Sequence, residues 1–212
     1  MISTAVLLAG GFGTRLQSVV SDVPKPLAPV AGRPFLDYQL LYLKHYGIQK
    51  VILSVGHLAD KVISTYGSSF EGLEIVYAVE EKPLGTGGAT RLAMQLSDAE
   101  KTFVLNGDSF FDVNLSEFSR LHTQTEPAAS LAMRQVEDAS RYGTIHTNAD
   151  HHISSFAEKT GLHQPGLING GIYILNTPTF LSRTPPEKSF SIEKDFFETQ
   201  MRELSFKAFE FK

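Results

Sequence analysis

Four short stretches of the 212-residue sequence bring together glycines, cations and carboxylates at spacings that suit phosphate chemistry. The first reads Leu8-Ala9-Gly10-Gly11-Phe12-Gly13-Thr14-Arg15-Leu16 and follows an apolar run. Glycines after a buried strand let backbone N–H groups approach an anion, and the arginine adds a fork of donors for phosphate oxygens. The stretch matches neither a dinucleotide fingerprint nor a Walker loop, because no glycine stands three residues after Gly13 and no Gly-Lys-Ser/Thr follows. Alone, it predicts either a phosphate-binding turn or a plain turn from strand to helix.

The second stretch, Pro24-Lys25-Pro26-Leu27-Ala28-Pro29-Val30, places one ammonium between two prolines. The prolines fix the backbone on both sides of Lys25, and we expect them to keep it out of a helix. A stiff loop of this kind can hold a point charge at a defined position. The alternative is a solvent-facing lysine in a proline-rich connection.

The third stretch, Asn106-Gly107-Asp108, follows the apolar run at 103–105. A carboxylate at the end of a buried strand can hold a divalent cation through one or two oxygens. The alternative is a local turn or a helix cap. Asp112 is a weaker candidate, because it lies four residues beyond Asp108.

The fourth stretch is Glu158-Lys159, with Tyr142-Gly143-Thr144 before it and Asn169-Gly170-Gly171 after it. Lys159 could meet a second phosphate, while Glu158 and Asn169 could bind sugar hydroxyls, which need both donors and acceptors. The alternative for Glu158 and Lys159 is an exposed strand end.

The elements around these stretches predict a parallel sheet covered by helices. Strands are expected at 5–8, 51–55, 74–79 and 103–105, and helices at 35–46, 58–66 and 89–96, with a glycine-rich loop at 83–88. Alternation at this spacing is typical of a parallel sheet with helices on both faces. Ligands of such sheets bind beyond the carboxyl ends of the strands, where the first and third stretches and the loop should meet.

The second half of the chain predicts an antiparallel extension on the same core. Strands are expected at 129–134, 143–147, 153–158 and 167–175, a helix at 191–201, and a final strand whose Phe209 and Phe211 enter the core. We therefore expect one α/β domain over 1–212 with a mixed, mainly parallel central sheet. Residues 1–112 would form its nucleotide-binding part and 113–212 its sugar-phosphate-binding part. Because the last strand stops in mid-pattern, we expect this second part to continue beyond Lys212.

Composition excludes several classes of protein. Hydrophobic residues make up 42% and charged residues 20%, as in an ordinary globular domain. There is no cysteine, so disulfides, thiolate metal sites and a cysteine nucleophile are excluded. A net charge of -4 argues against a nucleic-acid partner, and the absence of an apolar run of membrane length or a basic leader predicts a cytoplasmic protein without a membrane partner. Neither a nucleophile at Ser109 nor zinc at His151-His152 is expected.

Taken in order, the four stretches resemble the sugar-1-phosphate nucleotidyltransferases over essentially the whole chain. Gly-Gly-x-Gly-Thr-Arg-Leu followed by Pro-Lys-Pro is highly specific to that superfamily. Within it, the chain is most similar to the guanylyltransferases that act on D-glycero-α-D-manno-heptose 1-phosphate, on the sequences at 80–89, 105–112, 141–144 and 167–173. The resemblance implies a Rossmann-like nucleotidyltransferase domain and a reaction of GTP with a sugar 1-phosphate that gives a GDP-sugar, here GDP-heptose for bacterial surface polysaccharide, and pyrophosphate.

The resemblance also implies roles for the site residues. Arg15, Lys25, Asp108 and Lys159 would be catalytic, with Asp108 holding Mg²⁺ and a second metal acid lying beyond Lys212. The nucleotide would be bound by Leu8, Ala9, Gly10, Gly11, Gly13, Thr14, Arg15, Glu80, Gly85, Thr86, Gly88, Asn106 and Gly107. The sugar phosphate would be bound by Tyr142, Gly143, Glu158, Lys159, Asn169 and Gly170.

Three alternatives stay open at this point. The enzyme could use mannose 1-phosphate with GTP, or N-acetylmuramate 1-phosphate with UTP. The protein could instead be a nucleotide-sugar-binding module without turnover, against which the three cations Arg15, Lys25 and Lys159 argue. The sequence is compatible with a homo-oligomer.

Overall fold

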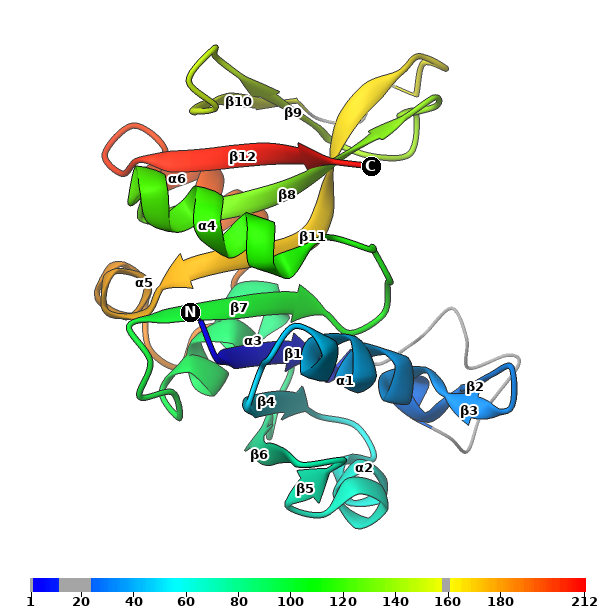
Figure 1. The fold of residues 1–212 in the computed structure, drawn as a ribbon. Helices are drawn as coiled ribbons and strands as arrows, with labels where there is room; N and C mark the ends of the chain where they lie inside the picture. Colours follow the sequence, from blue (N-terminus) through cyan, green and yellow to red (C-terminus); the bar gives the residue numbers. More distant parts are fainter. Residues whose placement is uncertain (1, 12–23, 158–160) are drawn as a thin grey trace.

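A ten-stranded mixed sheet runs through the protein, and its centre is parallel (Figure 1). The structure is a computed structural model that describes residues 2–11, 24–157 and 161–212. The parallel strands are β1 (Thr4–Leu8), β4 (Lys50–Val55), β6 (Leu73–Val79) and β7 (Lys101–Asn106), in the order β7-β1-β4-β6. Successive strands are added on one side of β1 and then, at β7, on the other. Ligands of open α/β sheets bind at this reversal, outside the carboxyl ends of β1 and β7.

The antiparallel strands continue the same sheet. β11 (Gly166–Asn176) runs antiparallel to β7 and joins the two halves. Beyond it lie β8 (Ala129–Val136), β9 (Thr144–Thr147), β10 (Ile153–Ala157) and β12 (Phe206–Phe211), of which β12 runs parallel to β8, while the short β5 (Ser69–Phe70) pairs with β6 at the opposite edge. The expected α/β domain with an antiparallel extension is confirmed, and Figure 1 shows the strands stacked from β9 and β10 at the top to β5 at the bottom.

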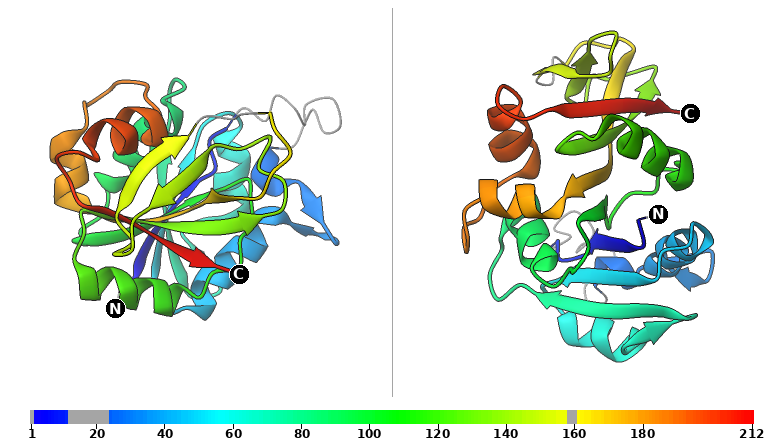
Figure 2. Two further views of the ribbon diagram at one scale, coloured as in Figure 1. Left: turned by 90° about the horizontal axis from the view of Figure 1, so that it is seen from above. Right: turned by 60° about the vertical axis from the view of Figure 1, so that its left-hand side comes forward.

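Helices bury both faces of the sheet. One face packs against α1 (Phe35–His45), α2 (Ala59–Tyr66) and α4 (Leu115–Thr125). The other packs against α3 (Gly85–Met94), α5 (Thr177–Arg183) and the π-helical turn η2 (Ile192–Phe197), which leads into α6 (Glu198–Gln200). In the right-hand view of Figure 2, α5 and α6 lie on one side of the sheet and α4 on the other.

Side chains along the central strands alternate between two cores. In β1, Val6 packs into the core under α3 and Leu7 into the core under α1. In β7, Val104 and Leu105 divide in the same way. Burial on both faces explains why these strands read as continuous apolar runs and were predictable. No helix in the described residues is long and apolar enough to cross a membrane.

Three local structures differ from the expectation. Lys25 does not lie outside a helix but begins a single 3₁₀ turn, η1 (Lys25–Leu27), because a proline in a first turn needs no backbone donor. Residues 29–34 form a small hairpin, β2 (Pro29–Val30) and β3 (Arg33–Pro34), which projects from the body in Figure 1. Helix α3 begins at Gly85 rather than at 89, so the glycine-rich segment is partly helical.

Helices α4 and α5 were not expected, and each has an asparagine cap. The Oδ1 of Asn114 accepts a hydrogen bond from Glu117 N at 3.0 Å, and that of Asn176 accepts one from Thr179 N at 3.0 Å. Such caps satisfy backbone donors that the first helical turn leaves without partners.

Candidate active site

A cleft of about 570 Å³ opens beyond the carboxyl ends of β1, β4, β6 and β7 and reaches the start of α3. Most of the residues predicted to bind the nucleotide line it, namely Leu8, Gly10, Gly11, Glu80, Gly85, Thr86, Asn106 and Gly107, together with Asp108. The sequence reading missed Gly56, His57, Glu81, Lys82, Pro83 and Ala89, which also line it. Gly56 and His57 directly follow the buried strand β4, so their position at a strand end was an available signal.

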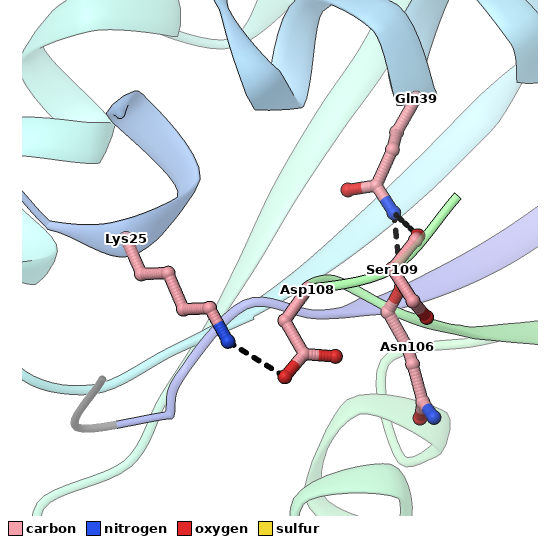
Figure 3. Close-up of polar contacts among 5 residues, drawn as sticks. All are labelled: Lys25, Gln39, Asn106, Asp108 and Ser109. Carbon is pink, nitrogen blue, oxygen red and sulfur yellow. Dashed lines mark hydrogen bonds and ion pairs between the residues drawn. The ribbon is translucent and has the colours of Figure 1, made fainter. Parts of the chain in front are cut away.

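An ion pair joins two of the predicted catalytic residues at this cleft. The Nζ of Lys25 donates to Oδ2 of Asp108 at 2.7 Å, and the two side chains are 28% and 56% exposed. Figure 3 shows Lys25 reaching from η1 toward the turn that follows β7. The proline-flanked turn η1 thus places a cation beside the carboxylate at the end of β7. A phosphate could contact the cation there, and a metal ion could contact the carboxylate.

Gln39 holds the turn that carries Asp108 and was missed from the sequence. Its side chain is 2% exposed, and its Nε2 donates to the carbonyl oxygens of Asn106 at 2.9 Å and Ser109 at 3.1 Å (Figure 3). The Oε1 of Gln39 is buried and has no hydrogen-bond partner among the described residues. The sequence did contain a signal for Gln39: it is a polar residue on the apolar stripe of α1, where the neighbouring core residues of the helix are leucines.

Gly107 lets β7 approach the end of β1. Its N–H donates to Leu8 O at 3.1 Å, and a Cβ at this position would lie 2.5 Å from the same oxygen. No other residue fits without backbone movement, because real Cβ contacts do not reach that distance. The glycine therefore fixes the direction in which Asp108 leaves the strand.

Glu80 fixes the opposite wall of the cleft. Its Oε1 accepts from Ser54 Oγ at 2.9 Å and its Oε2 from Leu84 N at 3.2 Å, at the start of α3. A Cβ on Gly10 would lie 2.3 Å from Oε1 of Glu80, so the glycine makes room for this carboxylate.

Two predicted nucleotide residues lie outside the cleft lining. Ala9 is buried, and its N–H donates to Ser54 O at 2.8 Å. Gly88 faces the segment after α5, where a Cβ would lie 2.6 Å from Lys188 O. Glycine is thus required at position 88 for packing. The sequence pattern alone does not distinguish a glycine required for packing from one that contacts a ligand.

The predicted sugar-side residues lie on the antiparallel half. Asn169 lies next to the cleft wall. Its Oδ1 accepts a hydrogen bond from Gly171 N at 2.9 Å, and Gly171 packs against Asn106, which lines the cleft: a Cβ on Gly171 would lie 2.5 Å from the side-chain amide nitrogen of Asn106. Gly170 backs onto the ring of Phe111. Tyr142 is 49% exposed and, like Gly143, does not line the cleft. The remaining predicted residues, Gly13, Thr14, Arg15, Glu158 and Lys159, lie outside the described residues.

The donor set at Asp108 fits a hard divalent cation. Its carboxylate is exposed at the cleft, and among the described residues its one partner is Lys25. Within the same part of the chain, no three acidic or histidine side chains form a metal cage. This arrangement suits Mg²⁺, which binds through one or two carboxylates together with substrate phosphates and keeps several waters.

Comparison with known proteins agrees with this geometry. The chain is 40% identical to a D-glycero-α-D-manno-heptose 1-phosphate guanylyltransferase of Aneurinibacillus thermoaerophilus, over 97% of this chain and 88% of the relative. It is 35% identical to a mannose-1-phosphate guanylyltransferase catalytic subunit beta of Dictyostelium discoideum, over 91% of this chain and 54% of that protein. The crystal structure of HddC from Yersinia pseudotuberculosis complexed with GMP-PN superposes with a TM-score of 0.84 at 35% identity, covering 100% of this chain and 91% of that one.

The nucleotidyl transferase family model matches residues 4–210, which span the sheet from β1 to all but the last residue of β12 and include both members of the Lys25–Asp108 pair. The chain therefore belongs to the nucleotidyl transferase family.

Proposed function

We propose that the protein is a guanylyltransferase that joins GTP and D-glycero-α-D-manno-heptose 1-phosphate to give GDP-heptose and pyrophosphate. The observation that carries the proposal is the Lys25–Asp108 pair in a cleft at the carboxyl ends of β1 and β7. The identity of 40% to a heptose 1-phosphate guanylyltransferase, with most of both chains covered, supports this choice of sugar and base.

The chemistry needs no protein nucleophile. An oxygen of the sugar phosphate attacks the α-phosphorus of GTP in line, and pyrophosphate leaves as the bond between the α-phosphorus and the bridging oxygen breaks. Repulsion between two polyanions is the main obstacle. Lys25 would lower it at the triphosphate, and the walls formed by Glu80, Gly107 and Thr86 would hold the nucleotide at near-attack distance.

Asp108 would hold Mg²⁺ in this reaction. When bound, the ion offsets charge on the triphosphate and on the leaving pyrophosphate. Gln39 would keep the turn that carries Asp108 in place, because one amide group donates to carbonyls on both sides of it.

The sugar phosphate would bind on the antiparallel half, at Tyr142, Gly143, Glu158, Lys159, Asn169 and Gly170. Arg15 and the backbone at Gly13 and Thr14 would complete the phosphate site. Residues 1–112 would thus serve the nucleotide and 113–212 the sugar. A protein that draws on GTP to supply precursors for bacterial surface polysaccharide would act in the cytoplasm, with small molecules rather than nucleic acid or membrane as partners.

Mannose 1-phosphate is the second candidate substrate, because the chain is also 35% identical to a mannose-1-phosphate guanylyltransferase. Pyrophosphate release would be measured for each of four nucleoside triphosphates against heptose, mannose and N-acetylmuramate 1-phosphates with Mg²⁺. The highest kcat/KM is expected for GTP with the heptose. A higher kcat/KM for mannose 1-phosphate would make mannose, not the heptose, the proposed sugar. If no combination of nucleotide and sugar phosphate released pyrophosphate, the proposed function would be overturned.

A further inference from the structure

A chain of side-chain hydrogen bonds connects the nucleotide cleft to the predicted sugar side through the interior. Thr86, which lines the cleft, donates from Oγ1 to Oε2 of Glu193 at 3.0 Å. The other oxygen, Oε1, accepts from the hydroxyl of Tyr173 at 3.3 Å. That hydroxyl accepts in turn from Nδ2 of Asn169 at 2.7 Å. The chain crosses from α3 through η2 to β11, and its Thr86–Glu193 bond joins residues 107 positions apart in the sequence.

The direction of each hydrogen bond is set by the groups present. Gly171 N donates to Oδ1 of Asn169, so the amide nitrogen of Asn169 must face Tyr173. Tyr173 is fully buried, and burial raises the pKa of its hydroxyl well above its ordinary value of 10.0. The phenol therefore keeps its proton and donates a hydrogen bond to Oε1 of Glu193. Both hydrogen-bonding atoms of the Asn169 amide are then engaged in a defined orientation.

Glu193 is held from its own element as well. Ser191 Oγ donates to Oε2 of Glu193 at 2.7 Å, and Ile192 N donates to Oγ1 of Thr86 at 3.0 Å. These bonds lie at the start of the π-helical turn η2, a type of local structure that is rare and often found at functional sites. A shift of Thr86 on nucleotide binding would change its contacts to both Glu193 and the backbone of η2.

We propose that Tyr173 and Glu193 are positioning residues that couple nucleotide binding at Thr86 to the orientation of the Asn169 side chain. The inference rests on the proposed function only in giving Thr86 to the nucleotide and Asn169 to the sugar phosphate. Neither Tyr173 nor Glu193 lines the cleft. Their effect is to make the sugar side respond to an occupied nucleotide site.

NMR of the 212-residue protein reads this coupling directly. The side-chain amide signals of Asn169 are assigned by comparison with Asn169→Asp, and GTP is then added without sugar, so that no turnover occurs. In the wild type these signals are expected to shift. In Tyr173→Phe, which keeps the ring and removes one hydroxyl, the shift is expected to vanish while calorimetry shows GTP affinity within about threefold of the wild type.

Matched variants separate coupling from general damage. Tyr66→Phe removes a hydroxyl that donates to Asp37 Oδ1 at 2.6 Å outside the cleft lining, and it should keep the Asn169 response. Thr86→Val breaks the chain at its other end and should abolish the response even at GTP concentrations that calorimetry shows to saturate the variant, whereas Thr86→Ser restores the hydroxyl and should recover it. The Thr86 pair decides the question even if Tyr173→Phe fails to fold.

Kinetics give a second readout. Thr86→Val should raise the KM for the sugar 1-phosphate about tenfold in the wild-type background and leave it unchanged in Tyr173→Phe, because groups in one network are not additive. An Asn169 signal that ignores every nucleoside triphosphate, or one that still responds in Tyr173→Phe and Thr86→Val, overturns the coupling. Absence of pyrophosphate release with every substrate pair overturns the proposed function instead and leaves the NMR result standing.

Discussion

Lys25 and Asp108 are separated by 83 positions in the chain, yet Nζ of one lies 2.7 Å from Oδ2 of the other. Each neutralises the other at the cleft. In the proposed reaction a triphosphate would compete for the ammonium and Mg²⁺ for the carboxylate, so the pair would supply the two charges that phosphoryl transfer needs.

Replacing Lys25 with alanine should cut kcat by about 10² or more, because one strong electrostatic donor to the transition state is lost. Stability should change by no more than about 1 kcal/mol, since the ion pair is partly exposed. Pyrophosphate release and urea unfolding measure the two effects. Lys44→Ala is the matched control, because it removes a pair with Glu71 at 3.3 Å outside the cleft and should leave kcat intact. Near-normal kcat in folded Lys25→Ala would contradict the assigned role.

Asp108→Asn should reduce activity roughly 10²-fold at limiting Mg²⁺, because an amide oxygen replaces a charged ligand. A titration of activity against Mg²⁺ should show the loss partly recovered at high concentration. Asp112→Asn, four residues further on, should behave like the wild type. If the Asp112 variant loses as much as the Asp108 variant, the metal acid has been misassigned.

Gln39→Met should lower stability by about 1–3 kcal/mol, because the carbonyls of Asn106 and Ser109 both lose their buried donor. The Mg²⁺ concentration for half-maximal activity should rise about tenfold, as it does when groups that orient a metal ligand are removed. Gln124→Met on the exposed side of α4 should change stability by less than about 0.5 kcal/mol. A Gln39 variant that is destabilised but keeps the wild-type Mg²⁺ dependence would make Gln39 a purely structural residue.

Stability should fall on acidification through His122. This side chain is fully buried, its Nδ1 lies 2.9 Å from Ser130 Oγ, and burial, with a smaller effect from Lys101, lowers its pKa to about 4. The unfolded chain, with a histidine pKa of about 6.5, binds the proton first, so stability is lost as the pH falls from about 6.5 toward 4, by up to about 1.4 kcal/mol per pH unit. Urea unfolding at pH 7 and pH 5 should show a shallower slope in His122→Leu than in the wild type. Removing the exposed His146 should leave the slope in place, and equal slopes in all three proteins would exclude His122 as its source.

Mannose 1-phosphate should be a poor substrate rather than an inert one. The heptose carries one more carbon beyond C6, and a pocket for such a group discriminates by only about 1–3 kcal/mol, or roughly 10- to 200-fold in kcat/KM. Steady-state kinetics with both sugars and GTP measure this ratio. Equal kcat/KM values would remove the heptose assignment and favour mannose.

The central sheet could be predicted because β1, β4 and β7 are buried on both faces and appear as apolar runs, while β6 keeps enough buried residues, at Leu73, Ile75 and Ala78, to be recognised as a strand. The ion pair was half predictable: Lys25 and Asp108 each stood out locally, but their contact depends on a sheet order that no local pattern contains. Gln39 could have been found as a polar residue on an apolar helical stripe. Glu193 carries no local signal, because its role comes from three elements that meet only in the folded chain.

The glycine-rich start of α3 is a segment whose secondary structure could not be predicted from its residue types. Glycine has a low helix propensity, and the run therefore suggested a loop. The helix forms there because the backbone and ring of Phe190 and the carbonyl of Lys188 pack where side chains would stand. Tertiary contact overrides local preference at that point.

The antiparallel pairing of β7 with β11 joins the parallel and antiparallel halves of the protein into one continuous sheet. Their ladder runs from Ile172 opposite Leu105 to Asn176 opposite Lys101, so rotation of one half against the other would break backbone hydrogen bonds along its whole length. A hinge motion between the halves is therefore disfavoured. Any closure over bound substrates would have to come from loops and side chains at the rim, and product release would then depend on local opening rather than on the stability of the sheet.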